Sequence, residues 1–305
     1  MKYLVAYIYT IFYSSFINCS LDCLIVFGDS LSDTGNLSKL TYGILPGSRY
    51  YNGRFSNGKI WVDYMKEKLD IKSVENYAYG AATTNNKVST IWKVIPSITD
   101  QVKRYSNKID TSCGSDKERY LVSYIGGTND YQNITTNPFD VVSNIEKDLT
   151  MLIKDYGFEQ IIVGNLPPVH LSPHVILTDS KRLNLFKLRA AIHNSLLSRL
   201  ISKLSNLYPN VNLSLFEFGS DFSCVSQWYN KPLPDGNPAY CFDENEDADP
   251  CINPEDFFFY DTLHPSTEAH YALSEFIATK FDRHIPQRCP PSHSYFKVFE
   301  NYSNI

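Results

Sequence analysis

Short apolar runs alternate with amphipathic stretches along most of the chain after residue 20, and this alternation limits the available folds more than any other feature. An apolar run of a few residues indicates a buried strand, and apolar residues at three- and four-residue spacing indicate a helix. Strands that alternate with helices form βαβ units and a mostly parallel sheet. The candidate strands are residues 24–27, 73–78, 120–126, 160–164 and 211–216.

Helical spacing predicts helices between and after these strands, at residues 58–69, 140–155, 180–207 and 266–281. Five strands with helices on both faces predict an α/β fold, a three-layer α/β/α sandwich around a parallel five-stranded sheet. Ligands of such sheets bind beyond the carboxyl ends of the strands. A chain of 305 residues can bury one sizeable core. We therefore expect one catalytic domain over residues 21–305.

Residues 1–20 predict a signal peptide. They open with Lys2 and continue as an apolar run to about residue 17, which is short for a membrane span. The alternatives are an uncleaved anchor and a lipoprotein signal at Cys19. Export would place the chain where disulfides form. We expect a secreted protein.

Residues 224–259 are rich in Pro, Asp, Glu and Asn and follow neither a helical nor a strand period, which predicts a long surface loop. Loops of this length are usually functional or disordered, so a lid and an unimportant insertion both stay open. Cys224, Cys241 and Cys251 lie within it, and we expect a local disulfide among them. A zinc site is the alternative, but the usual CxxC spacings are absent.

The charges nearly balance, with 33 acidic and 28 basic residues. This balance provides no strong positive field for binding phosphates, so a nucleic-acid partner is not expected. The histidines show no metal-ligand spacing with cysteines or carboxylates. No metal and no cofactor are expected.

A first chemical signal is the segment 25–36, IVFGDSLSDTGN, in which an apolar run leads directly into Gly28, Asp29 and Ser30. The glycine permits a tight turn that presents Ser30 at the carboxyl edge of the sheet. We also expect a helix N-terminus beside Ser30, because its partial positive charge would favour an oxyanion. The three letters GDS alone also occur in ordinary turns.

A second signal is the segment 260–266, YDTLHPS. Asp261 and His264 are three residues apart, so on a turn the carboxylate can hold the imidazole Nδ1 proton while Nε2 faces outward. A serine hydroxyl needs such a base to act as a nucleophile. Ser30, His264 and Asp261 are therefore the candidate catalytic residues, although a lone DxxH is more often a helix cap or a surface pair.

A third signal is the segment 124–130, YIGGTND, at another strand end. The side-chain amide of Asn129 can donate into a cleft there, and further backbone donors come from Ser30 and from the turn at 76–83. Together they would form an oxyanion hole. Two ordinary strand-to-helix turns are the alternative interpretation.

The segments GDSLSDTGN, NYAYGAATT, GGTND and DTLHP occur in this order, and together they resemble the four sequence blocks of the GDSL lipase/esterase family, also called SGNH hydrolases. The resemblance implies a flavodoxin-like sandwich, Ser30 as nucleophile with Asp261 and His264, and Asn129 with the Ser30 amide in the oxyanion hole. Where many members have two glycines, this chain has Gly80 and Ala81. Both are candidate donors, and Ala81 suits the role less well if its φ is positive.

Within the family, the cysteine-bracketed loop and the segment 251–266 are similar to secreted bacterial lysophospholipase A and glycerophospholipid:cholesterol acyltransferase members. This similarity implies hydrolysis of lipid acyl esters, as a lysophospholipase A or phospholipase A, at a membrane surface, with acyl transfer to an alcohol such as a sterol. The alternatives are a carbohydrate O-acetylesterase and a non-catalytic binding protein. The sequence does not indicate an oligomeric state.

Overall fold

Five parallel strands form one sheet in the order β2-β1-β3-β4-β5. The computed structural model describes residues 21–85, 94–105, 113, 116–177, 180–218, 239–246 and 249–278. The predicted α/β sandwich with five parallel strands is confirmed, and each strand lies within two residues of its expected bounds. The strands are β1 (Cys23–Gly28), β2 (Ser73–Asn76), β3 (Tyr120–Ile125), β4 (Gln160–Gly164) and β5 (Asn212–Phe216).

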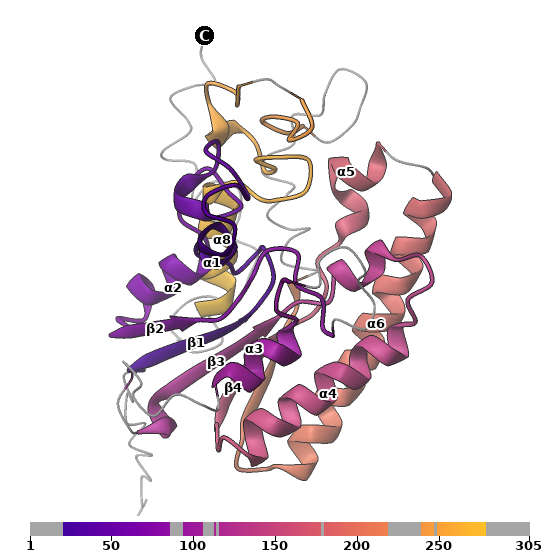
Figure 1. The fold of residues 1–305 in the computed structure, drawn as a ribbon. Coiled ribbons are helices and arrows are strands. Elements are labelled where there is room, and N and C mark those ends of the chain that lie inside the picture. Colours follow the sequence, from indigo (N-terminus) through magenta and orange to yellow (C-terminus); the bar gives the residue numbers. More distant parts are fainter. Residues whose placement is uncertain are drawn as a thin grey trace, which may run out of the picture.

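Alternate residues of the strands face two different cores. On β1, Ile25 and Phe27 pack in the cluster that includes α3 (Ile98–Tyr105), α4 (Pro138–Lys154) and α6 (Ser180–Leu207). Leu24 and Val26 pack in the cluster that includes α2 (Trp61–Lys68) and α8 (Thr267–Ala278). Figure 1 shows these helix groups on opposite faces of the sheet. Because a strand has a period of two, one run of apolar residues serves both layers. The sheet is therefore covered on both faces and opens for chemistry at its strand ends.

The four predicted helices are present, most of them with shifted ends, and the structure adds helices at 36–40, 98–105 and 173–176 that were not predicted. The predicted helix at 140–155 starts earlier, at Pro138, because Asn137 Oδ1 accepts the Phe139 N–H and proline suits the first turn. The remaining expected helices appear at 61–68, 180–207 and 267–278. The helices are α1 (Asn36–Leu40), α2 (Trp61–Lys68), α3 (Ile98–Tyr105), α4 (Pro138–Lys154), α5 (Pro173–Ile176), α6 (Ser180–Leu207) and α8 (Thr267–Ala278), with short 3₁₀ turns η1 (Tyr51–Gly53), η2 (Lys117–Arg119), η3 (Asn129–Gln132), η4 (Val169–Leu171) and η6 (Pro254–Asp256).

Two disulfides join described cysteines. Cys241 and Cys251 form the local bridge expected in the loop, and Cys23 of β1 pairs with Cys113, a pairing that cysteine parity did not identify. Cys224 and the predicted signal peptide at 1–20 lie outside the described residues. Within the described ranges, no helix is long and apolar enough to cross a membrane, and no three His, Cys, Asp or Glu side chains cluster as metal ligands.

Candidate active site

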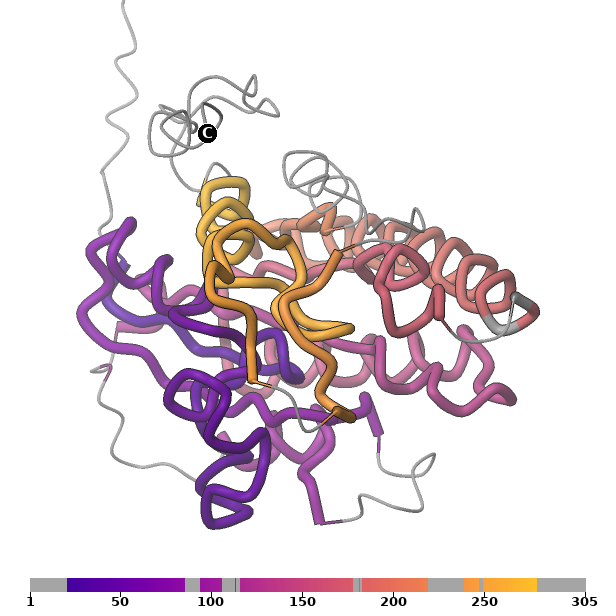
Figure 2. Tube along the Cα trace, turned by 90° about the horizontal axis from the view of Figure 1, so that it is seen from above, coloured from indigo at the N-terminus to yellow at the C-terminus, as the bar shows by residue number. Residues whose placement is uncertain are grey.

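The three sequence signals meet at the carboxyl edge of the sheet. Ser30 follows β1, Asn129 follows β3, and His264 precedes α8. The segment that carries His264 crosses this edge, drawn in orange and yellow in Figure 2, between the violet N-terminal turns and the pink helices. Residues far apart in the chain therefore lie around one site.

A tight turn after β1 presents Ser30. The Ser32 N–H donates to Asp29 O at 3.0 Å, and the Leu31 N–H donates to Asp29 Oδ1 at 3.1 Å. Gly28 is required at the strand end, because a Cβ there would lie 2.4 Å from the Ile125 carbonyl oxygen of β3. Ser30 is 9% exposed, so its hydroxyl lies at the floor of an opening.

The expectation of a helix N-terminus beside Ser30 is wrong. Helix α1 begins only at Asn36, and the carboxylate of Asp33 already accepts the N–H groups of Gly35, Asn36 and Leu37. The chain first closes the turn at 29–32 and then uses Asp33 to satisfy the free donors of the helix. Any positive field at Ser30 must therefore come from individual donors.

A line of hydrogen bonds joins the serine, the histidine and the aspartate. His264 Nε2 lies 2.9 Å from Ser30 Oγ, and His264 Nδ1 lies 2.7 Å from Asp261 Oδ2. The sequence predicted this set of residues as a serine nucleophile, its base and the carboxylate that orients the base. The distances meet the hydrogen-bond criterion for that arrangement.

The carboxylate of Asp261 accepts four hydrogen bonds. The N–H groups of Leu263 and His264 donate to Oδ1, while His264 Nδ1 and the Tyr50 hydroxyl share Oδ2. Burial alone would raise the pKa of Asp261, but the imidazole of His264 and these donors lower it below its ordinary value. Burial would likewise lower the pKa of His264, and the Asp261 carboxylate reverses this effect and raises it. Asp261 therefore stays ionised beside its base.

Tyr50 was not predicted as a site residue, although its hydroxyl lies 2.7 Å from Asp261 Oδ2. Its ring packs against the rings of Phe55, Phe242 and Tyr260 with centroid separations of 5.6 to 5.9 Å. Phe242 follows the disulfide-bonded Cys241 directly. The described part of the 224–259 loop thus helps to hold the tyrosine in place.

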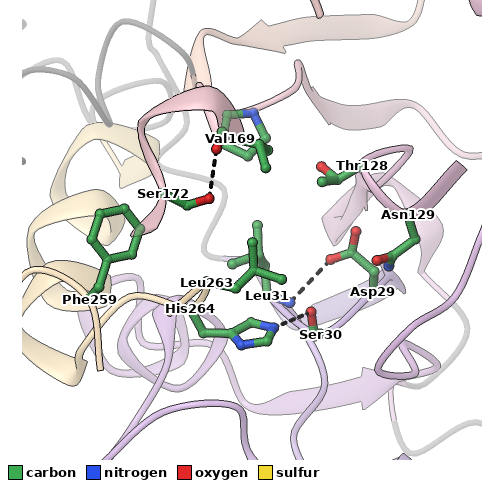
Figure 3. A pocket seen from close by; sticks show the side chains of 11 residues that line it. Asp29, Ser30, Leu31, Thr128, Asn129, Val169, Ser172, Phe259, Leu263 and His264 are labelled. Carbon is green, nitrogen blue, oxygen red and sulfur yellow. Dashed lines mark hydrogen bonds between the residues drawn. The ribbon is translucent and has the colours of Figure 1, made fainter. Parts of the chain in front are cut away.

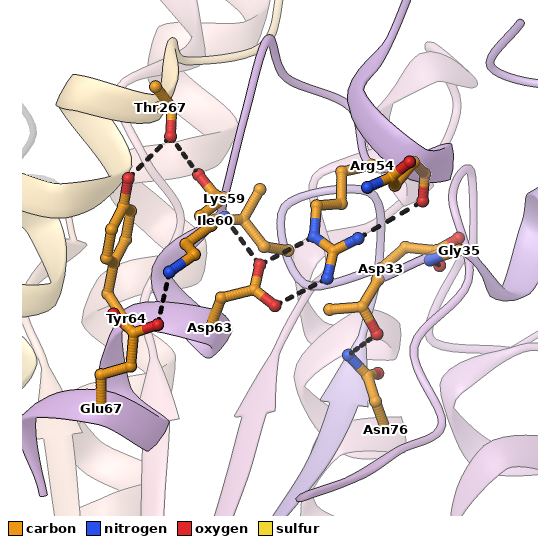
Figure 4. Close-up of polar contacts among 12 residues, drawn as sticks. Asp33, Gly35, Arg54, Lys59, Ile60, Asp63, Tyr64, Glu67, Asn76 and Thr267 are labelled. Carbon is orange, nitrogen blue, oxygen red and sulfur yellow. Dashed lines mark hydrogen bonds and ion pairs between the residues drawn. The ribbon is translucent and has the colours of Figure 1, made fainter. Parts of the chain in front are cut away.

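Contacts with residues 54–64 fix the segment that follows His264. Ser56 Oγ donates to Pro265 O at 2.9 Å, and Thr267 N donates to Asn57 Oδ1 at 2.8 Å. Figure 4 shows the hydroxyl of Thr267 between Tyr64 and the backbone of Lys59. The imidazole is therefore carried by a segment that is anchored directly after His264, which limits the movement of Nε2 away from Ser30.

The two backbone N–H groups predicted as oxyanion donors differ in whether they already donate a hydrogen bond. Gly80 N–H already donates to Asp33 Oδ2 at 2.8 Å, whereas no hydrogen bond joins the Ala81 N–H to another described residue. Ala81 has a φ of 61°, a left-handed conformation that glycine adopts with less strain. A Cβ on Gly80 would lie 2.4 Å from the Phe55 ring, which itself packs on His264, so glycine is needed there for packing. Of the two, Ala81 is the donor that we carry forward.

Asn129 lines the site and uses one of its two amide hydrogens on Ala82 O, at 3.0 Å. Gln132 Nε2 donates to Asn129 Oδ1, which fixes the orientation of the amide. The second hydrogen of Asn129 Nδ2 is left for a ligand. The hydrogen bond from Asn129 to Ala82 also joins the turn after β3 to the turn after β2, so the two predicted donor segments support one another.

A cleft opens beside Ser30 and His264 (Figure 3). Its polar side is formed by Asp29, Thr128 and Asn129. Phe259, the last residue of the predicted loop, belongs to the opposite wall and is itself 3% exposed, so it contributes both to the cleft and to the core. The apolar lining consists of Leu31, Pro167, Val169, Phe259 and Leu263.

Comparison with known proteins identifies the family. A family model described as GDSL-like lipase/acylhydrolase matches residues 24–277. The chain is 28% identical over 269 residues to the secreted effector protein SseJ of Salmonella typhimurium, with 84% of this chain and 63% of that protein covered. It is 27% identical over 307 residues to a phosphatidylcholine-sterol acyltransferase of Aeromonas hydrophila, with 84% and 89% covered.

Among solved structures, a family two carbohydrate esterase of Clostridium thermocellum matches with a TM-score of 0.47 and 14% identity, over 86% of this chain and 64% of that one. Of the two relatives compared by sequence, the chain spans less than two thirds of the length of SseJ and most of the length of the acyltransferase. The family model covers most of the chain, including the segments around Ser30, Asn129 and His264. The chain belongs to the GDSL-like lipase/acylhydrolase family and is a carboxylic ester hydrolase.

Proposed function

We propose that this chain is a secreted serine esterase that hydrolyses acyl esters of lipids, as a lysophospholipase A or phospholipase A, and that it transfers acyl groups to an acceptor alcohol such as a sterol. The observation that carries the proposal is the hydrogen-bonded line from Ser30 through His264 to Asp261. It lies beside a cleft whose wall is largely apolar. Ser30 is the nucleophile, His264 the general base, and Asp261 holds the base.

The first half-reaction forms an acyl-enzyme. His264 Nε2 accepts the Ser30 proton as Oγ bonds to the ester carbonyl carbon, and the carbonyl oxygen becomes an oxyanion. The imidazolium then donates that proton to the leaving alcohol as the old C–O bond breaks. The ionised Asp261 stabilises the imidazolium and keeps the Nδ1 proton in place.

The second half-reaction releases the acyl group. Water gives a proton to His264 and attacks the acyl carbon, and Ser30 recovers its proton as the fatty acid leaves. When an alcohol takes the place of water, the product is a new ester and the same residues act in the same order. An apolar cleft favours this outcome because it excludes water and accepts an apolar alcohol.

The oxyanion is stabilised by the backbone N–H groups of Ser30 and Ala81 and by the free amide hydrogen of Asn129. Preorganised donors of this kind contribute a few kcal/mol each to transition-state stabilisation. Asn129 is held for this task by its contacts with Ala82 and Gln132. The Gly80 N–H, which is bonded to Asp33, supports the turn instead.

The apolar wall supports lipid esters over acetylated sugars. Five of the lining side chains are hydrocarbon or aromatic, and burying an acyl chain against them gains roughly 0.8 kcal/mol per CH₂ group. An acetyl group would leave most of this wall in contact with water. The name of the Aeromonas hydrophila relative, phosphatidylcholine-sterol acyltransferase, agrees with a phospholipid donor and a sterol acceptor.

Three observations support secretion. The first twenty residues read as a signal peptide. Two disulfides join described cysteines, and disulfides persist in oxidising compartments. The Salmonella relative is named a secreted effector. A secreted enzyme would then encounter its lipid substrate at a membrane surface outside the cell that produces it.

The test compares products from three substrates. Purified protein is incubated with phospholipid, lysophospholipid and an acetylated oligosaccharide, with and without a sterol, and fatty acid, acetate and sterol ester are quantified. We expect fatty acid from the lipids and little acetate. Dominant release of acetate would instead support the carbohydrate O-acetylesterase.

Replacement of the nucleophile tests the mechanism on the same substrates. Ser30→Ala should lower kcat at least about 10⁴-fold while the thermal midpoint stays close to that of the wild type. Ser202→Ala, which removes an exposed hydroxyl of α6, is the matched control and should retain activity. Turnover by Ser30→Ala near the wild-type rate would refute the assignment.

A further inference from the structure

A second carboxyl group, that of Asp29, lines the cleft and has no task in the mechanism above. Asp29 is 2% exposed and lies next to Ser30 in the chain. Its Oδ1 accepts the Leu31 N–H at 3.1 Å, which fixes the plane of the carboxyl group. Apart from the Asp29 backbone N–H, no hydrogen bond joins another described residue to its Oδ2, and the carboxyl group faces the cleft. An acceptor that faces a cleft in this way is available to a ligand.

The free oxygen of Asp29 belongs to a polar corner of the cleft, which we define as Asp29 and Thr128. Figure 3 shows the carboxyl group of Asp29 and the hydroxyl of Thr128 on the same side of the cleft, across from Phe259 and Leu263. No hydrogen bond joins the Thr128 hydroxyl to another described residue. The corner thus combines an anionic acceptor with a hydroxyl that can donate or accept.

The charges around the polar corner limit what can bind there. Of the described residues that line the cleft, only His264 can carry a positive charge. Burial raises the pKa of Asp29 to about 6, and the Leu31 N–H and His264 act in the opposite direction. Asp29 is therefore mostly ionised near neutral pH. A phosphate group would be repelled from this corner, whereas a neutral hydroxyl can donate to Oδ2 and accept from Thr128.

We propose that Asp29 and Thr128 form a subsite for an aliphatic hydroxyl group close to the scissile ester. The inference rests on the proposed function and deepens it, because it makes partially acylated alcohols, such as a lysophospholipid or a monoacylglycerol, the preferred substrates. In a fully acylated lipid the neighbouring hydroxyl is itself esterified and has no proton to donate. The hydroxyl bound here comes either from the ester substrate or from the alcohol that accepts the acyl group.

The first arm of the test uses two esters that differ by one hydroxyl. The probes are a 1-acyl-glycero-3-phosphocholine and its 2-deoxy analogue, made from propanediol, with the same acyl chain. The wild type should prefer the hydroxylated ester by about tenfold in kcat/KM, the effect of one hydrogen bond to a charged group. In Asp29→Asn the ratio should fall to about threefold or less, because the amide keeps the Leu31 contact but removes the charge.

Two further variants separate the subsite from general damage. Thr128→Val keeps the shape of the side chain and removes its hydroxyl, so it should also lower the ratio. Asp155→Asn changes an exposed carboxyl after α4, at the opposite edge of the sheet, and should leave the ratio at the wild-type value. Thermal melts of all variants confirm that they fold. A wild-type ratio near one, or a ratio unchanged in both Asp29→Asn and Thr128→Val, excludes the ester substrate as the source of the hydroxyl. Together with sterol transfer that is unchanged in Asp29→Asn, it overturns the inference.

The pH dependence of the ratio gives an independent readout. The state of Ser30 and His264 affects both esters alike and cancels in the ratio. The ratio should therefore decline as pH falls through about 6 in the wild type and stay flat in Asp29→Asn. The charged groups that face Asp29 are His264 and the buried Asp130, whose carboxylate is held by Thr84. A decline of equal size in Asp29→Asn would assign the titration to a group other than Asp29 and overturn the role of Asp29.

The second arm identifies the source of the hydroxyl. With the deoxy ester as acyl donor and a sterol present, the ratio of sterol ester to fatty acid is measured in the wild type and in Asp29→Asn. A loss of transfer alone assigns the subsite to the acceptor, and a loss of ester discrimination alone assigns it to the substrate. The failures are distinguishable: a wild type that cleaves neither ester contradicts the proposed function, whereas cleavage with neither hydroxyl discrimination nor Asp29-dependent sterol transfer contradicts only this inference.

Discussion

Two buried carboxyl groups flank Ser30, and their pKa values are shifted in opposite directions. Asp261 is 1% exposed and accepts four hydrogen bonds, and its pKa lies below the ordinary value. Asp29 is 2% exposed, its Oδ1 accepts the backbone N–H of Leu31, and burial raises its pKa to about 6. Equal burial thus gives opposite shifts, because the imidazole of His264 binds the Asp261 carboxylate directly and the other donors add to its effect, whereas burial dominates at Asp29.

This difference separates two kinds of work. A carboxylate with all its acceptor positions filled is fixed in charge and direction, which suits the orientation of a base. A carboxyl group with one oxygen free toward a cleft is suited to bind a ligand. The predictions that follow change one side of this comparison at a time.

The largest effect is expected for Asp261→Asn. The amide is similar in shape, but it is neutral and can present a donor where the carboxylate presents an acceptor. The imidazole therefore loses its correct tautomer, and the imidazolium loses the negative charge that stabilises it. We expect kcat to fall about 10³- to 10⁴-fold, by analogy with the same change in other serine hydrolases. The measurement is steady-state hydrolysis of a soluble long-chain ester near pH 8.

The same assay of Asp29→Asn tests the comparison itself, since both changes remove one buried negative charge beside Ser30. A loss in Asp29→Asn as large as that in Asp261→Asn would mean that local charge, and not the orientation of His264, is what matters. Such a result would contradict the division of roles between the two carboxyl groups.

A smaller effect is expected for Tyr50→Phe, which removes one of the four donors to Asp261. The ring contacts with Phe55, Phe242 and Tyr260 are kept. We expect kcat to fall about three- to tenfold, which corresponds to about 1 kcal/mol for one hydrogen bond. Without the hydroxyl, more charge stays on Oδ2 and the imidazolium is better stabilised, so the pKa of His264 should rise further. The acidic limb of the kcat/KM profile should then move to higher pH.

Tyr51→Phe is the matched control for this change. Tyr51 is the next residue in the chain, is 42% exposed, and packs its ring on Arg54 rather than on the site. Its pH profile should coincide with that of the wild type. A loss of rate in Tyr50→Phe with an unmoved acidic limb would show that the tyrosine acts through packing and not through Asp261.

The sequence predicted most of the fold because the strands β1, β3 and β4 are largely apolar runs, which a two-sided core requires. Their ends were less accurate. The predicted strand at 73–78 stops at Asn76, whose side-chain oxygen accepts the Ala78 N–H and turns the chain away from the sheet. Such a contact depends on one side chain, and hydrophobic periodicity does not register it.

The sequence predicted those site residues that lie in short segments with a recognisable chemical pattern. Ser30, Asp261, His264 and Asn129 each belong to such a segment. Tyr50 does not, because it reaches Asp261 across 211 positions and stands in a stretch with no chemical pattern of its own. The pairing of Cys23 with Cys113 escaped prediction for a similar reason, since their 90-residue separation carries no pairing information. Both contacts join residues that are distant in the chain, and local sequence patterns do not predict such contacts.

A third buried carboxyl group, Asp148 of α4, extends the comparison to stability. Its Oδ2 accepts from Thr99 and Tyr124 at 3.0 Å each, while its Oδ1 has no hydrogen-bond partner in the described ranges. Burial raises the pKa of Asp148 to about 7, against the effect of these two hydroxyls. The folded state therefore binds this proton more tightly than the unfolded state. Its contribution to stability is present at low pH and is lost as pH rises through about 7.

The smallest effect is thus expected for Asp148→Asn, and it appears in the stability profile. Between pH 5.5 and 8.5 the wild type should lose stability on the order of 1 kcal/mol more than the variant, or a few degrees in thermal midpoint. The amide has no charge to desolvate, so its profile lacks this loss. Asp155→Asn, at an exposed position, should follow the wild type. Parallel profiles for wild type and Asp148→Asn would mean that Asp148 stays ionised in the core, and two donors would then suffice to stabilise a buried carboxylate.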